Sequence, residues 1–414
     1  MSDRAINGGT ATRIRARNVS KVFAATDEAL ALIAEGRDKA EIKEKTGSVV
    51  GVADVSFDVG AGETFVVMGL SGSGKSTLLR CLNRLITPTA GSVEIDGEDV
   101  VAADEKALRQ LRLGKIAMVF QHFALLPHRT VVENVEYGLK VQGIEARERR
   151  RRAEQVLELV GLESWSNSRT SELSGGMQQR VGLARALAVD PDILLMDEPF
   201  SALDPLIRRD MQDELLELQR RFRKTIVFIT HDLHEALKLG DRVAIMKAGR
   251  FVQVGAPEEI VANPADDYVS AFTQDVDSGR ILRLRTVMRA PVSMPMAEAD
   301  LAAVKRRLEG SKAVYLIDKA GRPVGLVDRR RLAQQAEAAS LQQIMRKDFP
   351  QAGAESPIVE IYKLCSQGLP IAVVDDEGRL QGAVDPLQVF AELAPQSKQG
   401  PKQRPGQPAA VAAK

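Results

Sequence analysis

Short apolar runs alternate along the chain with segments whose apolar positions recur at helical spacing. Thr64–Met68, Ile193–Met196 and Thr225–Ile229 are apolar runs rich in branched side chains, each bounded by turn residues. Such runs predict strands buried in the middle of a sheet. Because strands that alternate with amphipathic helices build parallel sheets, the pattern predicts an α/β domain with a largely parallel sheet over residues 13–275.

Two segments interrupt this alternation. Residues 101–190 are mostly helical in pattern, and the basic run Arg149–Arg152 should lie on a solvated helix face. A nucleic-acid contact is the less favoured interpretation of that run, so we expect no nucleic-acid partner. Residues 24–50 read as an insertion of short amphipathic helices, and Thr46-Gly47 predicts the end of the last one.

An internal repeat follows the α/β domain, within residues 281–393. Ile317–Asp328 aligns with Val374–Asp385 at a constant offset of 57 residues (317 to 374). Val287-Met288 and Ile344-Met345 match at the same offset. Each unit predicts a strand, an Asp/Gly turn and a second strand, with helices around them. Because neither unit is large enough to bury its own faces, the two should pack together.

Composition narrows the class of protein. The chain has 414 residues, 44 % apolar residues and a net charge of +1, which fits a globular protein without a general attraction to nucleic acid or membrane. No apolar run approaches the ~18–20 residues that span a bilayer. Residues 1–10 are polar and predict no signal peptide. Cys81 and Cys365 lie far apart, so we expect buried thiols in a reducing compartment. Residues 395–414 predict a disordered tail.

A glycine-rich loop carries the strongest chemical signal. Gly69–Thr77 matches G-x-x-x-x-G-K-[ST], with an apolar strand before it and the helical pattern of Leu78–Leu85 after it. In such a loop successive backbone N–H groups point at phosphate oxygens, the lysine contacts the β- and γ-phosphates, and the following hydroxyl ligates Mg²⁺. The predicted nucleotide-binding residues here are Gly69, Ser71, Gly72, Ser73, Gly74, Lys75, Ser76 and Thr77.

Polar residues at the ends of other apolar runs complete a candidate catalytic site. Asp197 and Glu198 end one run, and the carboxyl ends of strands are where open α/β sheets bind ligands. Asp197 is suited to hold Mg²⁺ and Glu198 to polarise the attacking water; the alternative is a pair of solvated acids. His231 follows another run and could bond the γ-phosphate, although a lone histidine is more often structural. Gln121 could reach the metal or the water.

The sequence resembles a known family at this point. Leu173–Arg180 is similar to the signature sequence of ABC ATPases, and the other motifs occur in that family's order over residues 13–275. The resemblance implies a P-loop ATPase fold with a mixed sheet and a helical subdomain, ATP and Mg²⁺ as ligands, and a homodimer. It implies that Ser174, Gly175 and Gly176 contact the γ-phosphate of a nucleotide held by the opposite subunit. The start of the helix after Ser174 is a suitable second anion site.

Two further site residues rest on the same resemblance. Asp204, at the end of Ser201–Asp204, would lie across the dimer interface beside the nucleotide. Phe23 matches the family's adenine-stacking aromatic residue, and the alternative is a core residue.

A closer resemblance is to the ATPase subunits of glycine betaine and proline betaine importers. It rests on the insertion after Phe23, on the wording around the motifs, and on the C-terminal repeat, which is similar to tandem CBS modules. It implies ATP hydrolysis coupled to import of a quaternary ammonium osmolyte such as glycine betaine, proline betaine or choline. It also implies integral membrane permease subunits, a separate substrate-binding protein, and peripheral attachment at the cytoplasmic face of the inner membrane. Residues 121–137 should grip the permease; the alternative for this segment is an ordinary solvated loop. The alternatives are an importer ATPase for another solute, such as an amino acid, and a soluble ABC ATPase without membrane partners.

The CBS-like pair departs from the nucleotide-binding pattern of such modules. Neither Asp328–Arg331 nor Asp385–Gln388 has the usual Thr/Ser-to-Asp arrangement. A basic surface that binds anionic lipid at low ionic strength is one hypothesis, and a dimerisation scaffold is the slightly favoured alternative. The arginines that suggest the lipid hypothesis are Arg280, Arg283, Arg285, Arg289, Arg329, Arg330 and Arg331.

Overall fold

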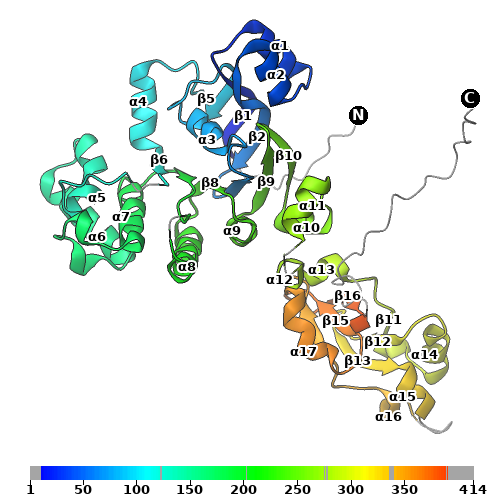
Figure 1. Cartoon of the computed structure of the whole chain (residues 1–414). Coiled ribbons are helices and arrows are strands. Elements are labelled where there is room, and N and C mark those ends of the chain that lie inside the picture. The colour runs from blue at the N-terminus through cyan, green and yellow to red at the C-terminus, as the bar shows by residue number, and fades with distance from the viewer. Residues whose placement is uncertain are drawn as a thin grey trace, which may run out of the picture. The chain divides into compact units, whose positions relative to one another are not determined.

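The computed structural model describes residues 11–121, 124–201, 203–274, 276, 278–334, 340–387 and 389 (Figure 1). The chain divides into two compact units, Met1–Thr273 and Gln274–Lys414. The predicted tail, residues 395–414, and the polar N-terminal residues 1–10 lie outside the described residues. No helix among the described residues has both the length and the apolar composition needed to cross a membrane.

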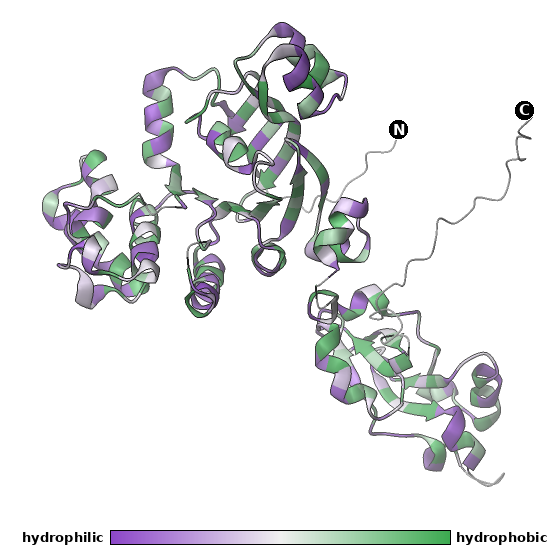
Figure 2. Cartoon of the chain, viewed as in Figure 1, coloured by the Kyte–Doolittle hydropathy of each residue, from purple (hydrophilic) through white to green (hydrophobic). Residues whose placement is uncertain are grey.

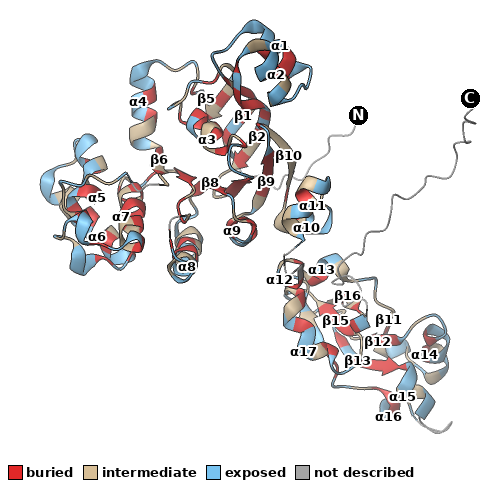
Figure 3. Ribbon diagram, viewed as in Figure 1, coloured by how far each residue is buried: buried red, intermediate tan, exposed pale blue. Residues whose placement is uncertain are grey.

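A six-stranded sheet forms the centre of the first unit, in the order β10-β9-β3-β8-β7-β6. The strands β3, β6, β7, β8 and β9 run parallel, and β10 is antiparallel to β9. Every residue of β3, β7 and β8 is buried (Figure 3), so the three strands predicted from their apolar runs are confirmed. The strands span Thr64–Met68 (β3), Ile116–Val119 (β6), Ile193–Asp197 (β7), Thr225–Thr230 (β8), Arg242–Lys247 (β9) and Arg250–Gly255 (β10).

A second, antiparallel sheet lies against the first, in the order β2-β1-β4-β5. Phe57 of this sheet stacks on Phe65 of β3, with ring centroids 4.9 Å apart, and one apolar cluster joins both sheets to helix α3 (Lys75–Leu82). The apolar runs considered in the sequence did not predict this sheet. Its strands span Thr12–Phe23 (β1), Val49–Gly60 (β2), Ala90–Ile95 (β4) and Glu98–Asp99 (β5).

The insertion forms two short helices, α1 (Asp27–Ala34) and α2 (Lys39–Thr46), as predicted. The side chains of Thr26 and Asp38 cap their N-termini, and Gly47 ends α2 with φ = +70°, a backbone conformation that glycine adopts without steric cost. Their apolar residues share a small core with β1 and β2. The insertion is therefore anchored to the antiparallel sheet.

The predicted helical region forms a core of its own. Apolar residues of α5 (Val131–Val141), α6 (Ala146–Leu159) and α7 (Gly175–Ala188) pack together, as the green faces in Figure 2 illustrate. The basic run Arg149–Arg152 of α6 forms ion pairs with nearby glutamates, which agrees with a solvated face. The remaining helices of this unit span Glu105–Gly114 (α4), Pro205–Phe222 (α8), Leu233–Leu239 (α9), Pro257–Ala262 (α10) and Asp267–Thr273 (α11).

The C-terminal unit contains two equivalent three-stranded sheets, β11-β12-β13 and β14-β15-β16. In each sheet the first two strands are parallel and the last two antiparallel. The strands span Ser293–Pro295 (β11), Ala313–Ile317 (β12), Pro323–Asp328 (β13), Gln351–Gly353 (β14), Ile371–Val374 (β15) and Leu380–Val384 (β16). The helices span Ser278–Ile281 (α12), Leu284–Val287 (α13), Leu301–Leu308 (α14), Arg329–Gln334 (α15), Leu341–Ile344 (α16) and Tyr362–Cys365 (α17).

The two repeats exchange contacts through matched residues. Met288 lies against Gly382 of β16, and Met345, at the repeat offset, lies against Gly325 of β13. Arg289 bridges to β16 and Arg346 bridges to β13 in the same way. The predicted strand–turn–strand units are present and pack together. The identification of this unit as tandem CBS modules stays a prediction, and so does the lipid hypothesis. One arginine of the proposed lipid-binding surface, Arg285, forms an ion pair with Glu355.

An ion pair between β13 and the second repeat leads to a pH prediction. Burial opposes ionisation of Asp328, but the Arg346 guanidinium at 2.7 Å and backbone N–H groups hold its pKa below the usual range. A depressed carboxyl pKa stabilises the fold above the unfolded pKa, and this contribution is lost as the pH falls through the folded pKa. Asp328→Asn should cost about 1.5–3 kcal/mol of unfolding free energy at pH 7 and less below pH ~4.

Calorimetry of the full chain across pH would measure this effect. Asp376→Asn, at an exposed turn position, is the control and should change little. Equal pH profiles for Asp328→Asn and the parent chain would contradict the assigned role of the pair.

Candidate nucleotide site

The predicted phosphate loop lies between β3 and α3, at the carboxyl end of the parallel strands. Gly69, Gly72 and Gly74 have φ values of +155°, +75° and +111°. A Cβ at Gly69 would overlap the carbonyl oxygen of Met246, and one at Gly74 would overlap that of Gly51. The positive φ angles favour glycine at all three positions, and close packing also requires it at Gly69 and Gly74.

Lys75 points back into the loop that precedes it. Its Nζ donates hydrogen bonds to the carbonyl oxygens of Gly69 at 2.9 Å and Leu70 at 3.1 Å, and lies 3.6 Å from a carboxylate oxygen of Glu198. The side chain is 4 % exposed, and burial lowers its pKa although Glu198 and Asp197 oppose that shift. A buried cation held by carbonyl oxygens is poised to exchange them for an anionic ligand.

The surroundings of the Ser73 hydroxyl indicate whether the loop suits a phosphate. Its Oγ is buried and has no hydrogen-bond partner within the part of the chain that the structure describes. A buried hydroxyl without a partner is unfavourable, so a phosphate oxygen in the loop would supply what is missing. With the backbone N–H groups of the α3 start, the loop has the donors that an anion needs.

The two carboxylates that end β7 have different surroundings. Asp197 is 2 % exposed, accepts a hydrogen bond from Ser76 Oγ at 2.6 Å and pairs with Arg80 at 3.3 Å. Glu198 adopts φ = +45°, a strained conformation for this residue that costs about 1–3 kcal/mol. Its backbone N–H donates to Ile229 O of β8, which holds the residue in place.

His231, at the end of β8, lies beside Glu198. Its Nδ1 is 3.0 Å from Glu198 Oε2, and the imidazole is about half exposed. The pair joins two neighbouring strand ends, as expected for polar residues that follow parallel strands. The structure thus brings Lys75, Ser76, Asp197, Glu198 and His231 together.

Gln121 and Phe23 make fewer contacts with the other residues of the candidate site. Gln121 follows β6 at the same end of the sheet, but within the described residues it makes no hydrogen bond to Ser76 or Asp197. Phe23 ends β1 and is 42 % exposed, which argues against the core interpretation. A Cβ at Gly51 would meet both the Phe23 ring and the Thr77 methyl group, so the ring lies near the start of α3.

The signature residues form a separate helix start. Ser174 caps α7 by accepting a hydrogen bond from Met177 N, Gly175 has open space at its Cα, and Gly176 packs on Ile207 of α8. Asp204 caps α8 and is exposed. Among the described residues, no hydrogen bond or ion pair joins these four positions to the phosphate loop of the same chain.

Three residues in these surroundings were missed by the sequence reasoning. Arg80 pairs with Asp197, and Arg208 and Glu235 contact the residues on either side of His231, namely Asp232 and Thr230. Their spacing was the available signal: Arg80 lies one helical turn after Ser76, Arg208 one turn after Asp204, and Glu235 four residues after His231.

A substitution pair tests the loop geometry. Gly74→Ala should destabilise the chain and abolish nucleotide binding, because the new methyl group would displace the Gly51 carbonyl. Gly97→Ala is the control, because Gly97 has φ = +81° but a Cβ added there would meet nothing within 4 Å. Thermal unfolding should show the larger loss for Gly74→Ala; equal losses would mean that backbone strain alone explains the glycine.

Comparisons with known proteins agree with this geometry. A family model described as ABC transporter matches residues 52–201. The chain is similar to the glycine betaine transport ATP-binding protein OpuAA of Bacillus subtilis, at 48 % identity over 90 % of each chain. It is 48 % identical to the trimethylamine N-oxide transport system ATP-binding protein TmoW of Ruegeria pomeroyi, over 77 % of this chain and 95 % of the relative. The dimeric ATP-binding cassette MJ0796, solved with ADP and Pi, matches with a TM-score of 0.51 at 34 % identity, over 59 % of this chain and 98 % of that one.

Proposed function

This chain belongs to the family of ABC transporter ATP-binding proteins, and from that premise we propose that it hydrolyses ATP to drive import of a quaternary ammonium osmolyte. The observation that carries the proposal is the meeting of Lys75, Ser76, Asp197, Glu198 and His231 at one end of the parallel sheet. This set supplies a phosphate-binding cation, an oxygen-donor pair and a carboxylate–imidazole pair.

ATP binds with its phosphates in the Gly69–Thr77 loop. Lys75 gives up the Gly69 and Leu70 carbonyl oxygens and bonds the β- and γ-phosphates, and Ser73 Oγ gains a phosphate partner. Phe23 supplies a surface on which the adenine stacks. Glu198 accepts a proton from the attacking water, and His231 orients Glu198 through Nδ1 and bonds the γ-phosphate.

Mg²⁺ fits the oxygen donors beside the loop. Ser76 Oγ and Asp197 Oδ1 are 2.6 Å apart, and hydroxyl, carboxylate and amide oxygens are the ligands that this ion prefers. Ser76, Asp197 and the side chain of Gln121 would hold it. When bound, the ion neutralises charge that develops on the β- and γ-phosphates.

The active form is a homodimer. In the described part of the chain, Ser174, Gly175 and Gly176 make no hydrogen bond to the phosphate loop of their own chain. The start of α7 nevertheless presents backbone N–H groups to solvent, with open space at Gly175. Facing the nucleotide of a twin chain, they close the site from the side opposite Lys75. Asp204 lies at the same interface. The dimeric MJ0796 cassette is consistent with this arrangement.

A membrane permease docks near Gln121. A pocket in this region is lined by apolar and basic side chains, including Met118, Phe120, Tyr137 and Arg112. A mixed apolar and cationic lining suits a short helix that projects from a membrane protein. The chain would then be held peripherally at the cytoplasmic face of the inner membrane, with a separate binding protein supplying the solute.

Transport by the reconstituted complex tests the proposal. The chain would be assembled with the permease and binding protein of its own transporter, in vesicles loaded with ATP and Mg²⁺. We expect ATP-dependent uptake of glycine betaine, proline betaine or choline, and none of an amino acid such as glutamine. Uptake of the amino acid alone would support an importer for another solute, and an ATPase that assembles with no permease would support a soluble ABC ATPase.

A further inference from the structure

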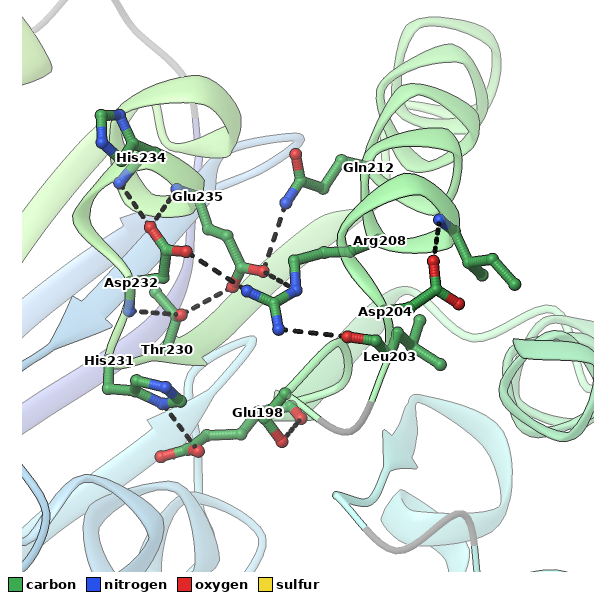
Figure 4. Close-up of polar contacts among 12 residues, drawn as sticks. Glu198, Leu203, Asp204, Arg208, Gln212, Thr230, His231, Asp232, His234 and Glu235 are labelled. Carbon is green, nitrogen blue, oxygen red and sulfur yellow. Dashed lines mark hydrogen bonds and ion pairs between the residues drawn. The ribbon is translucent and has the colours of Figure 1, made fainter. Parts of the chain in front are cut away.

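A buried polar network connects the turn that carries His231 with the turn that carries Asp204 (Figure 4). Thr230 Oγ1 donates a hydrogen bond to Glu235 Oε2 at 2.6 Å and accepts one from Asp232 N at 3.0 Å. Glu235 thereby orients the Thr230 hydroxyl, and that hydroxyl in turn holds the backbone N–H of Asp232 on the other side of His231. The His231 turn lies between β8 and α9, and Glu235 belongs to the first turn of α9.

Arg208, in the first turn of α8, bridges the two turns. Its guanidinium donates a hydrogen bond to Leu203 O at 3.2 Å, and another of its nitrogens lies 3.5 Å from Asp232 Oδ2. The Arg208 backbone N–H donates to Asp204 O at 2.9 Å. One planar side chain therefore ties the residue before Asp204 to the residue after His231.

The bridge is incomplete at one atom. Arg208 Nε is buried and has no hydrogen-bond partner within the described part of the chain, and it lies 3.9 Å from Glu235 Oε1. That oxygen accepts a hydrogen bond from Gln212 at 3.2 Å. Glu235 is 4 % exposed, and burial raises its pKa. Because a hydrogen bond needs about 2.9 Å, a shift of roughly 1 Å between α8 and α9 would complete the pair.

We infer that Arg208, together with Glu235, is a positioning residue that transmits the position of the Asp204 turn to the Glu198–His231 pair. The inference rests on the proposed function, in which the Asp204 turn faces the twin chain. Under it, a movement of Asp204 pulls the Leu203 carbonyl, Arg208 follows, and the His231 turn shifts relative to Glu198. Hydrolysis at one nucleotide then depends on how the twin is seated.

Arg208→Gln tests this coupling in the full transporter complex. Arg209→Gln is the matched control. It removes the same charge from the next residue of α8, which is less buried than Arg208 and makes none of the contacts of the bridge. For Arg208→Gln we expect ATP turnover at least tenfold below the parent, a Hill coefficient for ATP close to 1, and a Kd for ATP within twofold of the parent. The affinity is kept because the Lys75 loop is untouched. Arg209→Gln should match the parent in all three.

Glu235→Gln provides the second measurement. It keeps the volume, and its single amide oxygen can still accept the hydrogen bond from Thr230, but it gives up the bond from Gln212 and removes the charge that faces Arg208. Turnover should again fall with ATP affinity unchanged. If the two residues act together, the double variant should lose no more turnover than Arg208→Gln alone. Should Arg208→Gln fail to fold, the inference stands or falls on the turnover and Hill coefficient of Glu235→Gln.

Several outcomes would overturn the inference. Folded variants with turnover within twofold of the parent and an unchanged Hill coefficient would show that no coupling passes through this bridge. Parallel losses of turnover, ATP affinity and thermal stability would show a structural role only. A parent complex that hydrolyses no ATP would instead refute the proposed function itself. In that case Arg209→Gln would be as inactive as Arg208→Gln.

Discussion

Glu198→Gln should lower ATP turnover by at least 100-fold while ATP binding stays within a few-fold of the parent. The amide cannot accept the proton of the attacking water, and a positioned general base contributes typically about 10²–10⁴-fold. Gln is close in size to Glu, so the backbone at φ = +45° is expected to hold its place. Steady-state phosphate release and equilibrium ATP binding by the complex measure the two quantities separately.

Glu105→Gln is the control for this substitution, because Glu105 is an exposed partner of Arg84 far along the chain from β7. It should leave turnover unchanged. Near-normal turnover by Glu198→Gln would remove Glu198 from the water-activating role and leave His231 to be tested in its place.

Lys75→Ala should lose most of the affinity for ATP and, with it, nearly all turnover. Its buried ammonium is the only lysine charge that contacts Glu198 in the described residues, and it is held by two loop carbonyls that a phosphate would replace. A charge-assisted contact to phosphate is stronger than a neutral one, so roughly 100-fold weaker binding is expected. Binding of a labelled ATP analogue would measure the loss.

Lys45→Ala serves as the control for the lysine substitution. Lys45 pairs with Glu41 on the exposed face of α2, so its removal should not alter ATP affinity. ATP binding that survives in Lys75→Ala would mean that the loop backbone and Ser73 suffice to hold the phosphates.

Local patterns explain which parts of the fold could be predicted from sequence. β3, β7 and β8 are continuous apolar runs because both faces of each strand are buried. The loop after β3 could be predicted because its glycine, lysine and hydroxyl residues have a spacing that few structures other than phosphate loops require. The antiparallel sheet was missed because exposed or half-buried residues interrupt the buried ones along β1 and β2, and because the register between the two strands is irregular. Strands that mix apolar and polar residues contain no long apolar run, so a search for apolar runs does not detect them.

Some residues of the candidate site could likewise be predicted from the sequence, and others could not. Lys75, Asp197, Glu198 and His231 could be placed because each follows or ends a strand, and strand ends of a parallel sheet converge. Arg208 was not predicted: its spacing from Asp204 places it one turn along the helix, but its role depends on the approach of α8 to α9, a tertiary contact that this spacing does not reveal. The repeat offset predicted matched strands, whereas the exchange of Met288 and Met345 between repeats depends on packing.

We propose that two copies of the chain hold each ATP between the Lys75 loop of one and the Ser174–Gly176 helix start of the other. Light scattering of full-length Glu198→Gln, with and without ATP, measures this association, and the double variant that adds Gly175→Asp is measured with it. Gly175 has open space within its own chain, so the aspartate should fold but repel a phosphate across the interface. We expect an ATP-dependent dimer for Glu198→Gln and a monomer for the double variant. A monomer in the first case, or a dimer in both, would contradict it.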